Sequence, residues 1–308
     1  MRAAEPSPAG GLVRTPRRPR GFVARGPRPA RWDDPALAPR AGEDLCFLAG
    51  DWRILQRLDG HRWSLDDLVT AWRAASARAD APPARFIDLG CGIGSVLMLL
   101  AWRFPHARGV GVEAQQLSVD LARRSLAGNG ADDRVEVRHG DLRDPTLVPE
   151  GAVFDLVTGT PPYVPPGAGR VSPRPQRGPC RIEQRGGIED YCRAAARLLA
   201  PGGVFVACAG GAQTPRVAAA AHAAGLCLTE SRDVVPRAGK PPLLAVHVMR
   251  RRDDAVLDAD GSANADAGKD ADGASAGSVR HAPPLVVRAA DGRWTEEFAA
   301  LRRDMGMP

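Results

Sequence analysis

Residues 85–95, with the sequence RFIDLGCGIGS, constrain the fold of this chain more than any other stretch. A short apolar run enters a glycine turn, and the turn leads directly into a second apolar run of the kind that forms a buried helix. Glycines are needed where the chain reverses tightly and where a ligand must approach the backbone closely. An acid, Glu113, closes the next apolar run at about the 20-residue spacing found in nucleotide-binding sheets. The stretch therefore predicts the ligand-binding turn of an α/β sheet.

The composition indicates which partners and which cellular compartment to expect. The chain has 308 residues and a formal net charge of +6, which fits a polyanionic partner, although an Arg-rich, Lys-poor composition also reflects codon usage. Its six cysteines form no C-x-x-C pair and several lie in apolar runs, so we expect reduced cysteines in a cytoplasmic protein without a metal site. The longest apolar stretch, residues 93–102, is too short to span a bilayer. We expect a monomer with no membrane partner.

Strand and helix patterns alternate from residue 85 onward, which predicts an α/β fold with helices on both faces of a mostly parallel sheet. We expect this sheet to be Rossmann-like and seven-stranded. The expected strands after residues 85–89 are 109–113, 134–139, 153–158, 204–209, 226–235 and 243–249. The expected helices are 95–104, a helix ending near 126, 188–199 and one that begins at Thr214.

Five segments follow from composition and turn signals. Residues 1–43 are rich in Pro and Arg and predict a disordered basic arm, with a transit peptide or non-specific attraction to nucleic acid as alternatives. Residues 44–80 predict a hairpin turning at Asp59-Gly60, followed by a helix capped by Ser64 and Asp67. Residues 81–250 form the expected main domain, 251–281 a disordered Asp/Ala/Gly linker, and 282–308 a C-terminal strand and helix that pack on the domain.

Four motifs lie at the carboxyl ends of four successive predicted strands, where open α/β sheets bind ligands. They are Asp88 with its glycines, Glu113, Asp141 and residues 160–163. An anionic Asp88 before the glycine turn disfavours a pyrophosphate and suits a ligand that carries an ammonium and a sulfonium group. At this point the chain resembles the class I S-adenosylmethionine-dependent methyltransferases, whose first motif matches DLGCGIG at 88–94. The resemblance implies S-adenosylmethionine as cofactor, with Glu113 on the ribose hydroxyls and Asp141 beside the adenine; as ordinary surface acids, both would have no such role. The expected cofactor-binding residues are Asp88, Gly90, Cys91, Gly92, Gly94, Glu113 and Asp141.

The second informative stretch is TPPY, residues 160–163, directly after the fourth predicted strand. It resembles the (N/D/S)PPY motif of methyltransferases that act on an amino group attached to a planar system. In that motif the first side chain and the first proline carbonyl accept hydrogen bonds from the amino group, and the aromatic ring stacks on the plane. The resemblance implies Thr160, Pro161, Pro162 and Tyr163 as catalytic residues; alone, TPPY would be a Pro-Pro turn with a core tyrosine. The single hydroxyl of Thr160 cannot present a separate acceptor oxygen and donor nitrogen as the amide of Asn does, which leaves the target atom open.

Further stretches resemble the bacterial tRNA (valine) adenine amino-methyltransferases. They are residues 56–72, 181–203, 239–250 and 284–298. The resemblance implies adenine in tRNA or other structured RNA as acceptor, and it implies that Asp66 helps to close the cofactor pocket, unless it is a second capping acid. Alternative acceptors are a protein glutamine or a small amine, and a non-catalytic cofactor-binding module is a further alternative. The loop after Tyr163 carries arginines that could bind substrate phosphates or lie as solvated surface charges: Arg170, Arg174, Arg177, Arg181 and Arg185.

Overall fold

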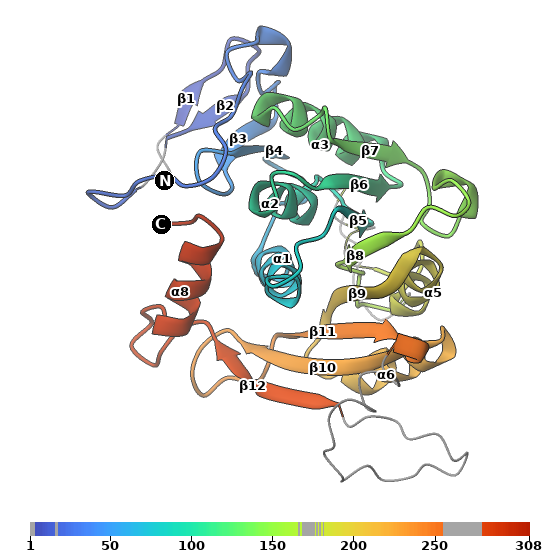
Figure 1. The fold of residues 1–308 in the computed structure, drawn as a ribbon. Coiled ribbons are helices and arrows are strands. Elements are labelled where there is room, and N and C mark those ends of the chain that lie inside the picture. Colours follow the sequence, from blue (N-terminus) through green and yellow to red (C-terminus); the bar gives the residue numbers. More distant parts are fainter. Residues whose placement is uncertain are drawn as a thin grey trace, which may run out of the picture.

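A single large sheet organises the computed structural model of the chain, which describes residues 4–15, 18–165, 167, 176, 178, 180, 182–254 and 279–308. The sheet has eight strands in the order β12-β10-β11-β9-β8-β5-β6-β7 (Figure 1). Its strands are β5 (Arg85–Leu89), β6 (Arg108–Glu113), β7 (Val135–His139), β8 (Phe154–Gly159), β9 (Leu199–Gly210), β10 (Leu226–Val235), β11 (Leu244–Arg251) and β12 (Arg280–Val286).

The strand directions confirm the predicted Rossmann-like architecture. Strands β7, β6, β5, β8 and β9 pair in parallel, whereas β11 is antiparallel to both β9 and β10. The predicted C-terminal strand adds to the sheet, since β12 pairs in parallel with β10. The described sheet is therefore eight-stranded, one strand more than expected.

Helices cover both faces of the sheet (Figure 1). Neighbouring residues of the central strands point to opposite faces, so Phe86 joins one buried core and Ile87 the other. The first core holds α1 (Leu65–Ala77), α2 (Ser95–Arg103), α3 (Gln116–Asn129) and α8 (Glu296–Asp304). The second holds α5 (Ile188–Leu198) and α6 (Thr214–Ala223). Among the described residues no helix is long and apolar enough to cross a membrane.

A second, four-stranded sheet lies before the main domain, with the order β1-β2-β3-β4. Its members are β1 (Ala4–Pro6), β2 (Leu12–Arg14), β3 (Glu43–Phe47) and β4 (Arg53–Arg57); two short 3-10 helices, η1 (Pro35–Leu37) and η2 (Pro145–Leu147), lie elsewhere in the chain. β3 and β4 form the predicted hairpin, but the turn between them lies at residues 48–52, where the Leu48 N–H donates to the Trp52 carbonyl. The prediction of a hairpin turn at Asp59-Gly60 was wrong.

The prediction of a disordered arm is also corrected, because residues 4–15 and 18–43 are packed against the domain. The Trp32 indole donates to the Asn129 side chain at 3.1 Å. Its ring lies so close to Gly128 that a Cβ there would come within 2.5 Å. Composition could not reveal this, because the partners lie 97 residues further along the chain. Of the predicted linker, residues 255–278 lie outside the described part.

Candidate active site

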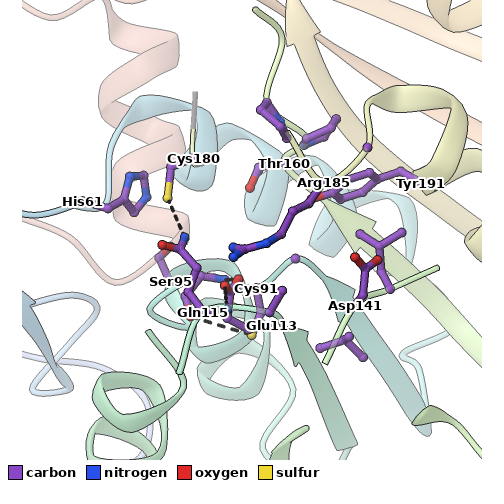
Figure 2. A pocket seen from close by; sticks show the side chains of 18 of the residues that line it. His61, Cys91, Ser95, Glu113, Gln115, Asp141, Thr160, Cys180, Arg185 and Tyr191 are labelled. Atoms are coloured by element: carbon purple, nitrogen blue, oxygen red, sulfur yellow. Dashed lines mark hydrogen bonds between the residues drawn. The ribbon is translucent and has the colours of Figure 1, made fainter. Parts of the chain in front are cut away.

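One cavity gathers most of the predicted site residues at the carboxyl ends of β5, β6 and β8 (Figure 2). Parallel strands meet at one edge of the sheet, so side chains from distant parts of the sequence converge there. The residues that line it are His61, Asp66, Asp67, Gly90, Cys91, Gly92, Ser95, Val112, Glu113, Ala114, Gln115, Gly140, Asp141, Leu142, Thr160, Pro161, Pro162, Tyr163, Cys180, Arg185, Gly186 and Tyr191.

The glycine turn forms the floor of the cavity. Gly92 has a φ of +55°, and a Cβ at this position would meet no atom of the described residues within 4 Å, so these leave open space for a ligand above the turn. Gly90 has a φ of +61° and lies against the Tyr191 hydroxyl, where a Cβ would come within 2.1 Å. Position 92 therefore favours glycine because of its left-handed backbone. Position 90 requires glycine both for its left-handed backbone and for its close packing against Tyr191.

Glu113 locks the turn to the end of β6. Its carboxylate accepts the Gly92 N–H at 3.0 Å and the Gln115 N–H at 2.6 Å. Burial raises the pKa of Glu113, although these two N–H groups act in the opposite direction. The residue thus has a structural role in addition to any contact with a ligand.

Two predicted cofactor residues, Asp88 and Gly94, do not line the cavity. Asp88 is 1% exposed and accepts a hydrogen bond from the Thr158 hydroxyl at 2.8 Å, below the turn. Burial raises the pKa of Asp88 to about 7. Gly94 has a left-handed backbone and forms the N-terminal cap of α2. Both residues support the turn from within the fold, and their contact with the cofactor stays a prediction.

Asp141 lines the far end of the cavity, but it is engaged with its neighbour. Its side chain accepts hydrogen bonds from the Arg143 backbone N–H at 3.0 Å and from the Arg143 guanidinium at 2.6 Å. The Arg143 side chain is the main reason that the pKa of Asp141 is lowered. Asp141 is therefore ionised, and an ionised carboxylate can accept a hydrogen bond from an amino group.

The TPPY residues line the opposite wall, and Tyr163 is fixed at two points. Its hydroxyl donates to Asp66 at 3.1 Å, and its carbonyl accepts the Gln213 side-chain amide at 3.0 Å. Burial, followed by the negative charge of Asp66, raises the pKa of Tyr163, so the phenol stays protonated and remains a donor. Asp66 lies within the Ser64–Asp67 cap of α1, in which the Ser64 N–H donates to Asp67 at 2.8 Å, as predicted.

Several lining residues were not predicted, because no linear motif marks them. Gln176 explains how they come together, since it accepts the His61 N–H at 2.9 Å and donates to the Ser118 hydroxyl at 3.1 Å. These bonds hold Gln176 against His61, which lines the cavity, and against Ser118 of α3. The unpredicted lining side chains labelled in Figure 2 are His61, Ser95, Gln115, Cys180 and Tyr191. Arg185, which also lines the cavity, is one of the predicted candidates for contact with substrate phosphates.

Two basic side chains face this cavity. Figure 2 shows Arg185 pointing across the cavity toward Glu113, and Arg185 acts to lower the pKa of both Glu113 and Asp141. Burial acts to lower the pKa of His61, but Cys180, Asp66 and Glu113 outweigh it and raise that pKa. Of the predicted substrate arginines, Arg170, Arg174, Arg177 and Arg181 lie outside the described residues.

The cavity has the chemistry to hold a cationic nucleoside. Four carboxyl groups line it, namely those of Asp66, Asp67, Glu113 and Asp141. S-adenosylmethionine carries a sulfonium and an ammonium group, so this acidic lining and the open backbone at Gly92 fit it. No group of three or more His, Cys, Asp or Glu side chains arranged to bind a metal occurs in the described part of the chain.

Comparison with known proteins agrees with this geometry. The model of a methyltransferase domain matches residues 86–165, the segment that contains both the glycine turn and TPPY. The chain is 32% identical over 140 residues to the tRNA1(Val) (adenine(37)-N6)-methyltransferase of Porphyromonas gingivalis, covering 44% of this chain and 53% of that protein.

Two other relatives act on different acceptors. One is the 4-amino-L-phenylalanine/4-methylamino-L-phenylalanine methyltransferase of Streptomyces pristinaespiralis, 35% identical over 165 residues (52% of this chain, 54% of that protein). Another is the release factor glutamine methyltransferase of Caulobacter vibrioides, 31% identical over 155 residues (48% of this chain, 52% of that protein). The chain spans about half the length of the curated relatives it matches.

A solved structure supports the fold. The crystal structure of a predicted O-methyltransferase from Agrobacterium tumefaciens aligns with a TM-score of 0.52 at 21% identity, covering 79% of this chain and 98% of that one. The glycine turn, the acid after β6 and the PPY stretch after β8 agree with these similarities. Residues 86–165 match a methyltransferase domain, and the chain has the fold of a solved methyltransferase.

Proposed function

We propose that the protein transfers a methyl group from S-adenosylmethionine to an exocyclic amino group on a planar acceptor, with adenine in tRNA or other structured RNA as the first candidate. The observation that carries this proposal is that TPPY lines the same cavity as the glycine turn and Glu113. An acceptor on TPPY would therefore meet a donor on the turn. Transfer then depends on positioning, since the two reactants are held in one enclosed site.

The residues of the chain divide into two groups. The Gly92 backbone, Glu113 and Asp141 would hold the cofactor, and the acidic lining would attract its positive charge. When bound, S-adenosylmethionine supplies a methyl group on a positively charged sulfur. Thr160 and the Pro161 carbonyl would accept hydrogen bonds from the amino group, which keeps its lone pair directed at the donor.

Tyr163 would supply the stacking surface for the acceptor. Asp66 and Gln213 fix its two ends, so the ring is held in place before the acceptor binds. Stacking on an aromatic side chain contributes roughly 1–3 kcal/mol per base, which offsets part of the cost of turning a base out of its stack.

Because of Thr160, acceptors other than adenine are also candidates. It stands where the amino-adenine enzymes usually carry Asn, and relatives named for a glutamine and for an arylamine acceptor match the chain at similar identity. A glutamine amide and an arylamine are also planar amino groups, so the same wall could orient them. These possibilities share methyl transfer to an amino group and differ only in the acceptor molecule.

The test offers three acceptors in parallel to the full-length protein with methyl-labelled cofactor: an unmodified valine tRNA transcript, a purified bacterial release factor and 4-amino-L-phenylalanine. Tyr163→Ala serves as the control, because it removes the stacking surface and leaves the glycine turn intact. Label in the tRNA that depends on Tyr163 supports the proposal. Label only in the release factor or in the amino acid replaces adenine as acceptor, and cofactor binding without any transfer would indicate a non-catalytic module.

A further inference from the structure

We infer that the surface at the carboxyl ends of β10 and β12, beyond the cavity, binds the phosphate backbone of the RNA whose base enters the cavity. We call this surface the basic edge and define it as Arg237, Lys240, Arg288 and Trp294. The inference rests on the proposed function, because it names a surface that would hold the same substrate outside the cavity.

The basic edge is continuous with the acceptor wall. Gln213 bonds the Tyr163 carbonyl, and two residues before it the Gly211 N–H donates to the Leu243 carbonyl at 3.4 Å. Leu243 closes the loop that carries Arg237 and Lys240 between β10 and β11. The Ala238 N–H in this loop donates to the Arg288 carbonyl at 2.8 Å. A chain of backbone contacts thus links the cavity to the segment after β12.

The strand directions explain why these segments share one edge. β10 and β12 run in the same direction as β8 and β9, so their carboxyl ends lie on the side of the sheet where the cavity opens. β12 is four strand positions away from β8. With strands about 4.8 Å apart, this edge extends about 19 Å from the acceptor wall. Successive phosphates of a bound RNA could follow such an edge, because they are only a few ångströms apart along a strand.

The cations of the basic edge differ from the arginines that form ion pairs within the fold. Several buried or half-buried arginines pair with carboxylates, as Arg73 does with Glu230 at 2.7 Å and Arg124 with Glu43 at 3.0 Å. Within the described ranges, Arg237, Lys240 and Arg288 are exposed and form no ion pair with a carboxylate. The nearby Arg302 has a lowered pKa because of burial first and the positive charge of Arg288 second. Exposed cations that have no carboxylate partner of their own favour a polyanionic partner.

Trp294 favours RNA over an acidic protein as this partner. It is 42% exposed, although large aromatic side chains are usually covered. The Arg302 guanidinium lies 3.9 Å from the centre of its ring and the Arg288 guanidinium 5.9 Å, so the indole lies beside two cations. Unstacked RNA bases stack on aromatic rings and guanidinium planes, whereas an acidic protein would need only the charges.

The experiment measures binding of an unmodified valine tRNA transcript to the full-length protein by fluorescence anisotropy, over about 50 to 200 mM salt. The test variant combines Arg237→Ala, Lys240→Ala and Arg288→Ala. The matched control combines Arg103→Ala, Arg108→Ala and Arg197→Ala, which are also exposed and lie at the ends of α2 and α5 and the start of β6, on the opposite edge of the sheet. Cofactor affinity and the thermal midpoint report whether each variant is folded.

We expect the test variant to bind at least about tenfold more weakly and to lower the slope of log affinity against log salt by about 2 to 3, because each lost phosphate contact removes nearly one unit. The control variant should bind like the wild type. Trp294→Ala should weaken binding about fivefold or more without changing the slope, because stacking is not ionic. If the triple variant does not fold, Lys240→Glu on the exposed loop tests the same charge and should weaken binding more steeply at low salt.

The outcomes separate this inference from the proposed function. Unchanged affinity and salt slope in the test variant, with normal methylation of the tRNA, would overturn the basic edge and leave the enzyme proposal in place. Equal losses in the test and control variants would also overturn it, since they indicate general attraction to a basic protein. Binding that depends on the basic edge, without methyl transfer to any RNA, would overturn the proposed acceptor and retain the edge.

Discussion

The hydrogen bond between Tyr163 and Asp66 offers the sharpest test of how the acceptor wall works. The bond is 3.1 Å long, and the pair lies half-buried between the TPPY loop and α1. Hydrogen bonds to charged groups contribute roughly 1.5–3 kcal/mol. We therefore expect Tyr163→Phe, which keeps the ring and loses the hydroxyl, to lower kcat/KM for methyl transfer by roughly 10-fold to 100-fold. Tyr163→Ala should lower it further, because stacking is lost as well.

Substitutions of Asp66 test the same hydrogen bond from its acceptor side. In Asp66→Asn an oxygen can still accept the tyrosine hydroxyl, so the loss should be smaller than in Asp66→Ala. In a double-mutant cycle, Asp66→Ala should cost little in a protein that already carries Tyr163→Phe, giving a coupling energy of about 1 kcal/mol or more. The assay is steady-state transfer from labelled cofactor, with cofactor affinity measured separately by calorimetry. Additive losses, or a loss of cofactor affinity in Tyr163→Phe as large as the loss of transfer, would refute this reasoning.

Three further changes test the site and its support. Glu113→Ala removes the acceptor for the Gly92 and Gln115 N–H groups, so cofactor affinity measured by calorimetry should fall about tenfold or more, whereas unchanged affinity would remove Glu113 from the cofactor site. Asp88→Asn should be more stable than the wild type above pH 7, by at most about 4 kcal/mol in urea titrations, and similar near pH 4, because a carboxyl with a folded pKa of about 7 favours folding only while it is protonated. His247 is fully buried, its ring nitrogens have no partner, and burial lowers its pKa to about 4. Stability contributed by the neutral ring is therefore lost as pH falls from 6.5 to 4, so His247→Leu should gain about 3 kcal/mol relative to the wild type over that interval, and a constant difference across the interval would contradict the assignment.

The part of the site that the sequence predicts consists of linear motifs. The glycine turn, Glu113 and TPPY were identified because each has a short pattern and a fixed place after a strand, and the structure brings them to one cavity. The burial of Asp88 below the turn could not be predicted, because its neighbours in the sequence do not reveal that the Thr158 hydroxyl donates to it at 2.8 Å.

The rest depends on contacts between distant segments. Gln176 reaches Ser118 across 58 residues and His61 across 115, so no local pattern could show that Gln176 contacts both. The basic edge likewise arises only when β10 and β12 pair and bring residues 237–240 beside residues 288–294. The packing of residues 18–43 was missed because a Pro- and Arg-rich composition describes the chain's own preference for disorder and contains no information on the partners that bind it.

Nucleoside mass spectrometry tests the central claim most directly. Unmodified tRNA is incubated with the full-length protein and S-adenosylmethionine, digested to nucleosides and compared with the same reaction of Tyr163→Ala. Our account predicts a methyladenosine carrying its methyl group on the exocyclic amino nitrogen, absent from the Tyr163→Ala reaction. A methyl group on a ring nitrogen or ribose, or the same product in both reactions, would contradict it.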